Sequence, residues 1–378
     1  MTMHAIDKPR HRLLSLDFFR GLTVVAMILV NNPGDWDHIY PPLEHAAWNG
    51  CTPTDLIFPF FLFIVGVSIP YALENKINDP VLHKKVMPQI LRRALLIFLL
   101  GILVQLFPRF DFATLRIPGV LQRIAIVYLV CAVFYTRSSK KAMSWILGLI
   151  LIVYYVLMNW IPVPGVGDAN LEPGTNLAAW LDNLVFTQAH MWNQTKTWDP
   201  EGILSTVPAI GTGLMGVLTG IWLRRKDRMQ AERVAWLFFA GIVSVILALI
   251  WDPFFPINKS LWTSSFVLYT GGFAIIGLTL SYWLIDVQGI HGFTKPFVVY
   301  GANAITVFVV SGILPTLLNF IKVNDKGVST SLLPYLYQRF FTPGFTPVNA
   351  SLAWAIVYVL IFLVPLWMMY NRKIFIKI

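Results

Sequence analysis

Long apolar runs separated by short polar segments dominate this chain, and the pattern predicts a bundle of membrane-spanning helices. A helix that crosses the hydrocarbon core of a bilayer needs about 20 mostly apolar residues. Ten runs of this kind occur, at 13–31, 53–73, 91–107, 117–135, 142–160, 203–223, 234–251, 261–285, 297–318 and 351–370. The run at 91–107 is the shortest, so nine or eleven spans remain alternatives. We expect an all-α polytopic integral membrane protein in which residues 1–378 form a single transmembrane domain.

The basic residues predict how the bundle lies in the membrane. Lys and Arg concentrate in the cytoplasmic loops of membrane proteins. With the N-terminus in the cytoplasm, 20 of the 29 Lys and Arg residues fall on the cytoplasmic side and seven on the opposite side, while Arg20 and Arg123 lie within predicted spans. This bias predicts that both termini are cytoplasmic and that segments 32–52, 161–202 and 319–350 are not. It accounts for the net charge of +10 without a nucleic-acid partner, and we expect a multi-pass protein of the cell inner membrane.

The start of the chain has a basic segment, residues 8–12, which continues into the first apolar run without a small-residue cleavage site. We therefore predict an uncleaved first helix and not a signal peptide. Cys51 and Cys131 are the only cysteines, and the predicted topology puts them on different sides of the membrane, which argues against a disulfide. The Cys, His, Asp and Glu residues do not show the spacing of a metal site.

Polar residues inside the predicted spans are candidates for function, because ionisable groups are costly in hydrocarbon. Asp17 and Arg20 are three residues apart, which places them on one helical face. They form either a structural ion pair or a site at which Arg20 meets an anionic ligand. Arg123 has no acid near it in the sequence, so we expect its partner to be Asp55, Asp17 or a ligand. Asn303, near the start of the ninth run, is either a packing residue or a residue that lines a path.

The segment ahead of the second apolar run holds the best candidate for a catalytic base. His45 lies close to Trp48 and Asn49 in this segment. A neutral imidazole near pH 7 can take a proton from an attacking nucleophile. Asn31, at the end of the first run, is placed to hold the imidazole or to donate to a developing oxyanion, and Asp55 is placed to orient the ring or tune its charge. The alternative is a surface histidine without a catalytic role.

Segment 161–202 is rich in Trp, Asn and Pro and ends in WDPEG, which contains Glu201. This mixture of polar and aromatic residues suits a sugar-binding surface. An aromatic belt at the membrane interface is the alternative interpretation.

Six motifs in a fixed order carry a resemblance to a known family. They are SLDFFRGLTVVAMILVNN, HAAWNGCTPTDLIFPFFLFIVG, RIPGVLQRIAIVY, WDPEGILSTV, INKSLWTSSFVL and PFVVYGANAI. Together they resemble the motif series of the heparan-α-glucosaminide N-acetyltransferase family, including its bacterial NagX-type members. The resemblance implies a transmembrane acyltransferase domain that moves acetyl from cytoplasmic acetyl-CoA to the amine of an extracytoplasmic glucosamine-type sugar.

The resemblance also implies roles for single residues. It maps the family's active-site histidine onto His45, with Asn31 and Asp55 beside it, and the arginine of the LQR motif onto Arg123. The expected sites are a catalytic set, an acetyl-CoA set and an acceptor set, with no metal. The catalytic set is His45, Asn31 and Asp55. The acetyl-CoA set is Arg123, Arg20 and Asn303, and the acceptor set is Trp48, Asn49 and Glu201.

The resemblance and the apolar runs together set the expected partners. We expect acetyl-CoA, an amino-sugar acceptor and the lipid bilayer as partners, no nucleic acid, and a homodimer as an open option. The family's lysosomal enzyme has an additional N-terminal domain and helix. We expect no counterpart of them in this protein, and therefore expect a smaller amino sugar as the acceptor. Two alternatives stay open: an acetyl-histidine intermediate in place of direct transfer, and an amino-sugar transporter without chemistry. The paired repeats and broken helices that are common in transporters are not clear in the sequence.

Overall fold

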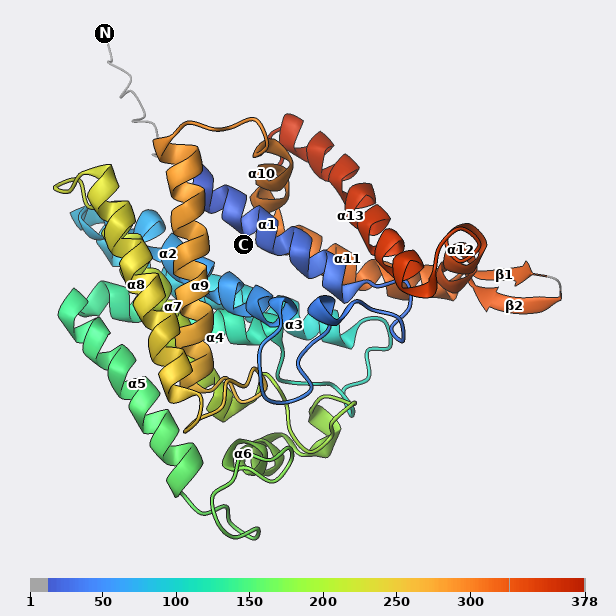
Figure 1. The fold of residues 1–378 in the computed structure, drawn as a ribbon, viewed down its shortest axis with the longest axis horizontal. Coiled ribbons are helices and arrows are strands. Elements are labelled where there is room, and N and C mark those ends of the chain that lie inside the picture. Colours follow the sequence, from blue (N-terminus) through green and yellow to red (C-terminus); the bar gives the residue numbers. More distant parts are fainter. Residues whose placement is uncertain (1–12, 326, 377–378) are drawn as a thin grey trace.

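The computed structural model describes residues 13–325 and 327–376, and its architecture is that of a helical bundle (Figure 1). Within these residues, nine helices are long and apolar enough to cross a membrane. They are α1 (Leu14–Asn31), α2 (Ile57–Ile77), α3 (Pro80–Leu106), α4 (Val120–Arg137), α5 (Lys140–Trp160), α7 (Ile203–Leu223), α8 (Gln230–Trp251), α9 (Ser264–Tyr282) and α13 (Pro347–Asn371). The predicted class, an all-α polytopic membrane protein, is confirmed.

The ninth predicted run is a broken helix. It forms α10 (Lys295–Ala302) and α11 (Ala304–Phe320), which meet at Asn303 with a bend of 80°. The pair makes a tenth span if its two halves are counted as one. The described part of the chain therefore agrees with the ten predicted runs, with one of them bent.

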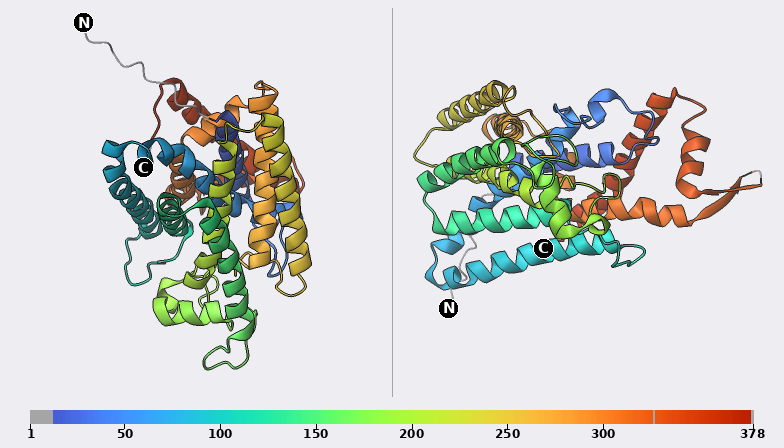
Figure 2. Two further views of the ribbon diagram at one scale, coloured as in Figure 1. Left: turned by 90° about the vertical axis from the view of Figure 1, so that its left-hand side faces the viewer. Right: turned by 90° about the horizontal axis from the view of Figure 1, so that it is seen from below.

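Shorter elements connect the long helices. They are α6 (Leu177–Phe186), α12 (Leu332–Phe340), the strands β1 (Lys322–Asp325) and β2 (Val328–Ser331), 3-10 turns at Pro41–Leu43, Pro53–Leu56 and Gln188–His190, and a π-helical turn at Trp283–Val287. The antiparallel β1–β2 hairpin projects away from the bundle beyond α11 in both Figure 1 and Figure 2. The sequence analysis did not predict this hairpin.

Helix α3 begins eleven residues earlier than the apolar run at 91–107 because its first turn is capped by polar groups. The Asp79 carboxylate accepts hydrogen bonds from the backbone N–H groups of Val81 and Leu82, at 2.8 and 3.2 Å. Pro80 occupies the first helical position, where its missing N–H is harmless. Lys84 and Lys85 are therefore part of the helix, although they lie outside the apolar run.

Helices α2 and α7 pack closely in the core of the bundle, and α7 is the most buried of the candidate spans. A Cβ atom at Gly66 would lie 2.1 Å from the carbonyl oxygen of Gly213, and one at Gly216 would lie 2.1 Å from the carbonyl oxygen of Phe63. Small residues allow this close approach, which is how membrane helices associate without a hydrophobic driving force. The contact fixes the start of α2 relative to α7.

The connections that the charge pattern places outside the cytoplasm meet at one end of the bundle. Trp48 Nε1 donates to the Leu171 carbonyl at 3.0 Å, and this bond joins the connection that follows α1 to the one that follows α5. The Asp35 N–H donates to Ser351 Oγ at 3.1 Å, which joins the first of these connections to the start of α13. All candidate site residues in loops therefore lie at the same end.

Candidate active site

The start of α2 holds the buried carboxylate of Asp55. The turn at Pro53–Leu56 leads into the helix, and Thr52 precedes it as the capping residue. The Thr52 N–H and hydroxyl both lie 3.1 Å from Asp55 Oδ2, and the Ala46 N–H donates to the same oxygen at 3.0 Å. Such reciprocal caps satisfy the donors that a helix start leaves open. Asp55 is only 1% exposed, so the fold fixes its position.

His45 faces the other oxygen of this carboxylate. Its Nδ1 lies 2.7 Å from Asp55 Oδ1. An ionised carboxylate only accepts hydrogen bonds, so Nδ1 carries a proton, and in the neutral ring the lone pair lies on Nε2. The His45 side chain is 53% exposed. The pair therefore presents a basic nitrogen on a half-exposed ring. The contact is the one that an orienting role of Asp55 requires, and that role stays a prediction.

Lys259, which the sequence analysis did not select, completes a cluster with these two residues. Its Nζ lies 2.9 Å from His45 Nδ1, 3.3 Å from His45 Nε2 and 3.3 Å from Asp55 Oδ1. Burial lowers the pKa of Lys259 below its ordinary value, and the charge of Asp55 opposes that effect. The signal in the sequence is weak: Lys259 is one of the few basic residues on the side predicted to be extracytoplasmic.

Hydrogen bonds hold the α8–α9 connection against the segment that precedes α2. Asn258 Nδ2 donates to Asn49 Oδ1 at 3.1 Å, and the Gly50 N–H donates to the Ile257 carbonyl at 2.7 Å. Asn258 is 1% exposed. These bonds bring Lys259 to a histidine that is 214 positions away in the sequence.

Cys51 lies beside this cluster without being a suitable nucleophile. Burial, and to a smaller extent the charge of Asp55, raise the pKa of the Cys51 thiol to about 12. This cysteine therefore stays protonated near neutral pH, whereas the reactive form of a cysteine is the thiolate. Cys51 and Cys131 are both free thiols, and the residues with described positions contain no group of three or more metal-ligating side chains.

The three residues expected at the acceptor site make contacts that join the loops. Trp48 packs edge-on against Trp198, with ring centroids 5.1 Å apart, in addition to its bond to segment 161–202. Asn49 receives the bond from Asn258 described above. Glu201 forms an ion pair with Arg116. Trp48 and Asn49 thus border the His45 segment, and the Glu201 carboxylate is engaged by a cation.

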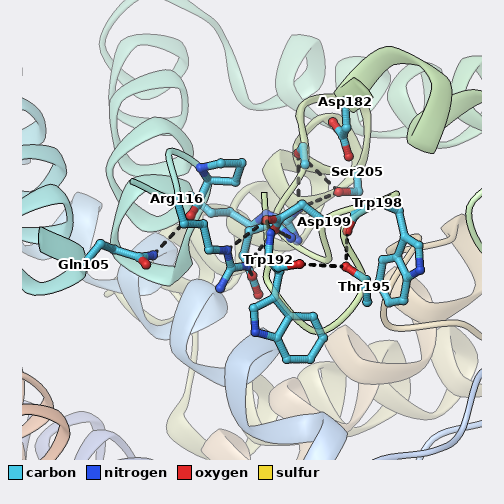
Figure 3. A network of polar contacts seen from close by, with 12 residues as sticks. Gln105, Arg116, Asp182, Trp192, Thr195, Trp198, Asp199 and Ser205 are labelled. Carbon is cyan, nitrogen blue, oxygen red and sulfur yellow. Dashed lines mark hydrogen bonds and ion pairs between the residues drawn. The ribbon is translucent and has the colours of Figure 1, made fainter. Parts of the chain in front are cut away.

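Arg116 organises a buried polar network around the WDPEG motif (Figure 3). Its Nε and Nη2 donate to the two oxygens of Asp199 at 2.8 and 2.6 Å, and its guanidinium lies over the ring of Trp192. Asp199 also accepts from the Trp192 N–H at 3.0 Å and the Glu201 N–H at 2.9 Å. Despite desolvation, these acids raise the pKa of Arg116 above its usual value. The network fixes the shape of the segment that leads into α7.

Asp182 of α6 caps the start of α7 from the same region. Its Oδ1 accepts from the Ile203 N–H at 2.9 Å. A Cβ atom at Gly202 would lie 2.0 Å from Asp182 Oδ2, so only glycine fits there. Asp182 is 2% exposed, and its burial raises the pKa of the carboxyl to about 7.

The acidic partners that we expected for Arg123 are not its partners. Its guanidinium donates to the Gly202 carbonyl at 3.3 Å and to Ser205 Oγ, and it lies 5.0 Å from the centroid of the Trp262 ring. The reason is its place in the first turn of α4, which packs against the first turn of α7. Arg123 is 1% exposed, and within the described structure its Nε and Nη1 have no hydrogen-bond partner.

The other two residues expected to bind acetyl-CoA lie elsewhere in the bundle. Arg20 forms the predicted ion pair with Asp17 at 2.9 Å and also donates to Ser68 Oγ at 3.0 Å. Asn303, at the break between α10 and α11, donates to the Ile374 carbonyl at 3.1 Å and accepts from the Ile376 N–H at 2.9 Å. Its amide thus holds the segment that follows α13.

Asn31 ends α1 and lines a cavity of about 760 Å³ between α1, α11, α12 and α13. Aromatic side chains and amides share this lining, among them Trp354, Tyr337 and Gln338. Among the described residues, no hydrogen bond joins Asn31 to His45. The imidazole contacts Asp55 and Lys259, and the residues that line the cavity with Asn31 do not include His45.

Comparison with known proteins identifies the family of this chain. Residues 12–253 match the family model described as heparan-alpha-glucosaminide N-acetyltransferase, catalytic. The chain is also similar to proteins of that name from Homo sapiens, at 31% identity over 79% of this chain and 52% of the relative, and from Mus musculus, at 30% over 79% and 53%. It therefore spans about half the length of the curated relatives that it matches. Because the family model covers more than half of the chain, this protein belongs to the heparan-α-glucosaminide N-acetyltransferase family.

Proposed function

We propose that this protein transfers an acetyl group from acetyl-CoA to the amine of a glucosamine-type sugar, with His45 as the general base. The contact between His45 Nδ1 and the buried Asp55 carboxylate carries the proposal. It leaves the second ring nitrogen accessible at one end of a membrane bundle, as a base for an external nucleophile must be. Membership of an N-acetyltransferase family supports the reaction class.

The proposed chemistry is a direct acyl transfer. The neutral sugar amine attacks the thioester carbonyl carbon, and His45 Nε2 takes the N–H proton as the new C–N bond forms. The tetrahedral intermediate then collapses with cleavage of the C–S bond, and the imidazolium returns the proton to the CoA thiolate. Asn31 or a backbone N–H is proposed to support the oxyanion. The rival route passes through an acetyl-imidazole on His45.

The charge pattern supports a transmembrane arrangement for this reaction. We place both termini in the cytoplasm, so that acetyl-CoA approaches from the cytoplasm and the acceptor from the opposite face of a cell inner membrane. For the donor site we retain Arg123, Arg20 and Asn303, and the unpartnered Nε and Nη1 of Arg123 support contact with a carbonyl or anionic group. Trp48, Asn49 and Glu201 are retained for the acceptor side.

Labelled acetyl-CoA and glucosamine test the proposal on the purified full-length chain in detergent. His45→Ala should lose at least about 10²-fold in kcat, since general base catalysis contributes about 10²–10⁴-fold. His38→Ala is the matched control, because His38 forms a similar contact with Asp35 in the same connection. Full turnover by His45→Ala would overturn the assignment of the base. Quenching the enzyme with labelled acetyl-CoA and no acceptor distinguishes the routes, because only an acetyl-imidazole leaves label on the protein.

One observation favours a second candidate, an amino-sugar transporter. The 80° break between α10 and α11 resembles the discontinuous helices that form transporter sites. Ligand binding raises the melting temperature of the folded state. A shift with glucosamine but none with acetyl-CoA would favour transport, whereas a shift with acetyl-CoA supports the acyltransferase.

A further inference from the structure

Nζ of Lys259 lies beside the imidazole ring of His45, off the lone-pair axis of either ring nitrogen. Its Nζ is almost equally distant from both ring nitrogens, at 2.9 and 3.3 Å. The two ring nitrogens flank a single carbon, so an atom placed between them lies on the lone-pair axis of neither. With Asp55 at Nδ1, a substrate amine would approach Nε2 of this side chain, which is 53% exposed. Lys259 is therefore a neighbour of the reacting position.

Asp55 does not need Lys259 to satisfy its hydrogen bonds. One oxygen accepts from the Ala46 N–H and from the N–H and hydroxyl of Thr52, and the other accepts from His45. The lysine adds a cation 3.3 Å from an already satisfied carboxylate. Pairing with Asp55 does not by itself require that Nζ also lie within 2.9 and 3.3 Å of the two ring nitrogens of His45.

We infer that Lys259 is a catalytic residue whose ammonium group stabilises the negative charge that develops on the thioester oxygen beside His45. The inference deepens the proposed function and rests on it. An ammonium group has three N–H donors; Nζ lies 3.3 Å from Asp55 and beside the imidazole of His45, where the reacting group would bind. Attack on a thioester moves an electron pair onto the carbonyl oxygen, and a fixed cation in a partly desolvated site stabilises that charge strongly. The Lys259 side chain is 23% exposed, which fits such a site.

The ligand chemistry follows from this assignment. The group that lies next to Nζ is an acyl carbonyl that becomes anionic during transfer. The substrate amine occupies the Nε2 side, and Asp55 balances the charge of the lysine in the resting site. The cluster therefore separates its tasks: His45 moves the proton, and Lys259 stabilises the oxyanion.

The test compares Lys259→Gln, Lys259→Arg and Lys322→Gln in the full-length protein. Lys322 is an exposed lysine on β1, bonded to Ser331 and separate from the cluster, so its variant is the control. Lys259→Gln should lower kcat by about 10²–10³-fold, the usual effect of removing an oxyanion donor, with KM for glucosamine little changed. Lys259→Arg keeps the charge and should restore part of kcat. Melting temperatures of all variants should stay close to that of the wild type.

The outcomes separate the inference from the proposed function. If wild-type protein and Lys322→Gln transfer no acetyl group, the proposed function fails and the role of Lys259 fails with it. If both transfer acetyl and Lys259→Gln keeps the wild-type kcat, only the role of Lys259 fails. Equal loss in Lys259→Arg and Lys259→Gln together with a lower melting temperature would show a structural role and also overturn it. Acetylated Lys259 found by mass spectrometry as a turnover intermediate would replace oxyanion stabilisation with covalent transfer.

Discussion

Two histidine–aspartate pairs lie in the connection between α1 and α2, and they differ in the burial of the acid. His38 and Asp35 are 2.7 Å apart, and so are His45 and Asp55. The Asp35 side chain is 31% exposed, whereas that of Asp55 is 1% exposed. A hydrogen bond to a carboxylate is electrostatically stronger where water is excluded. The buried acid therefore holds its imidazole in one orientation, and the exposed pair is a natural comparison.

Replacing Asp55 by Asn should impair the base more than the fold. An amide keeps an acceptor oxygen for the cap at Thr52 but no longer selects the Nδ1–H form of His45. We expect kcat for acetyl transfer to fall by roughly 10²–10⁴-fold. Asp35→Asn, measured in parallel, should leave kcat unchanged. Equal kcat values for the two variants would contradict a special role for the buried pair.

The pKa of Asp182 predicts a pH-dependent stability. Burial raises the pKa of this carboxyl from its ordinary value near 4 to about 7 in the folded protein. Protonated Asp182 therefore stabilises the folded state. This contribution to the free energy of unfolding is fully present below about pH 4 and is lost as the pH rises to about 7. The contribution of Asp182 to the free energy of unfolding falls by about 1.4 kcal/mol per pH unit within this window.

Asp182→Asn removes this dependence and provides the measurement. The melting temperature of the wild type relative to the variant should fall between pH 4.5 and pH 7 and then level off. A difference between the two proteins that does not change over this range would show that Asp182 has an ordinary pKa.

At the level of elements, the contact between α2 and α7 helps to position the cluster of His45, Asp55 and Lys259. The start of α2 carries Asp55, and the start of α7 carries Ser205, which binds Arg123 of α4. Glycines set the distance between the two helices through backbone contacts. The position of the proposed base thus depends on residues well inside the bundle.

Gly216→Ala should destabilise the protein. The new methyl group would lie 2.1 Å from the Phe63 carbonyl oxygen, so the helices must separate. Overpacking of this kind costs about 1–3 kcal/mol, which thermal unfolding in detergent can measure. Gly148→Ala in α5 is the control, because its Cβ has no neighbour within 4 Å. A Gly216→Ala protein as stable as this control would show that α2 and α7 are not tightly packed.

At the scale of the whole molecule, the connections that contact one another form one end of the bundle. The cluster of His45, Asp55 and Lys259 belongs to this end, and so does the cavity beside Asn31. The charge bias of the sequence predicts that this end is extracytoplasmic.

Single cysteines test the orientation in intact cells. Asn193 and Lys226 are exposed residues on opposite predicted sides. In a Cys51→Ala background, Asn193→Cys should react with a membrane-impermeant maleimide from outside. Lys226→Cys should react only after the membrane is permeabilised, and the buried Cys131 should not react. The reverse pattern of labelling would invert the proposed topology.

Local chemistry made part of this site predictable from the sequence. The apolar runs identify the spans because length and hydropathy alone decide membrane insertion. His45 and Asp55 are ten residues apart, so their proximity follows from one turn before a helix. Lys259 reaches them through the packing of distant helices, which has no local sequence signal. The acidic partners expected for Arg123 were wrong for the same reason, since the register of α4 against α7 is a tertiary property; its contact with a ligand stays a prediction. The bend at Asn303 was missed because the hydropathy of a run does not distinguish a straight helix from a bent one.

The position of Lys259 determines how much of the chain is needed to contain the complete cluster. The region that matches the family model stops at residue 253, six positions before the lysine and ahead of α9. A fragment cut at that boundary would contain His45 and Asp55 but would lack the cation that contacts both. The asparagine that anchors the α8–α9 connection to Asn49 would be missing as well. Protein fragments and sequence comparisons limited to the matched region would therefore divide the cluster, which is complete only in a piece that extends past Lys259.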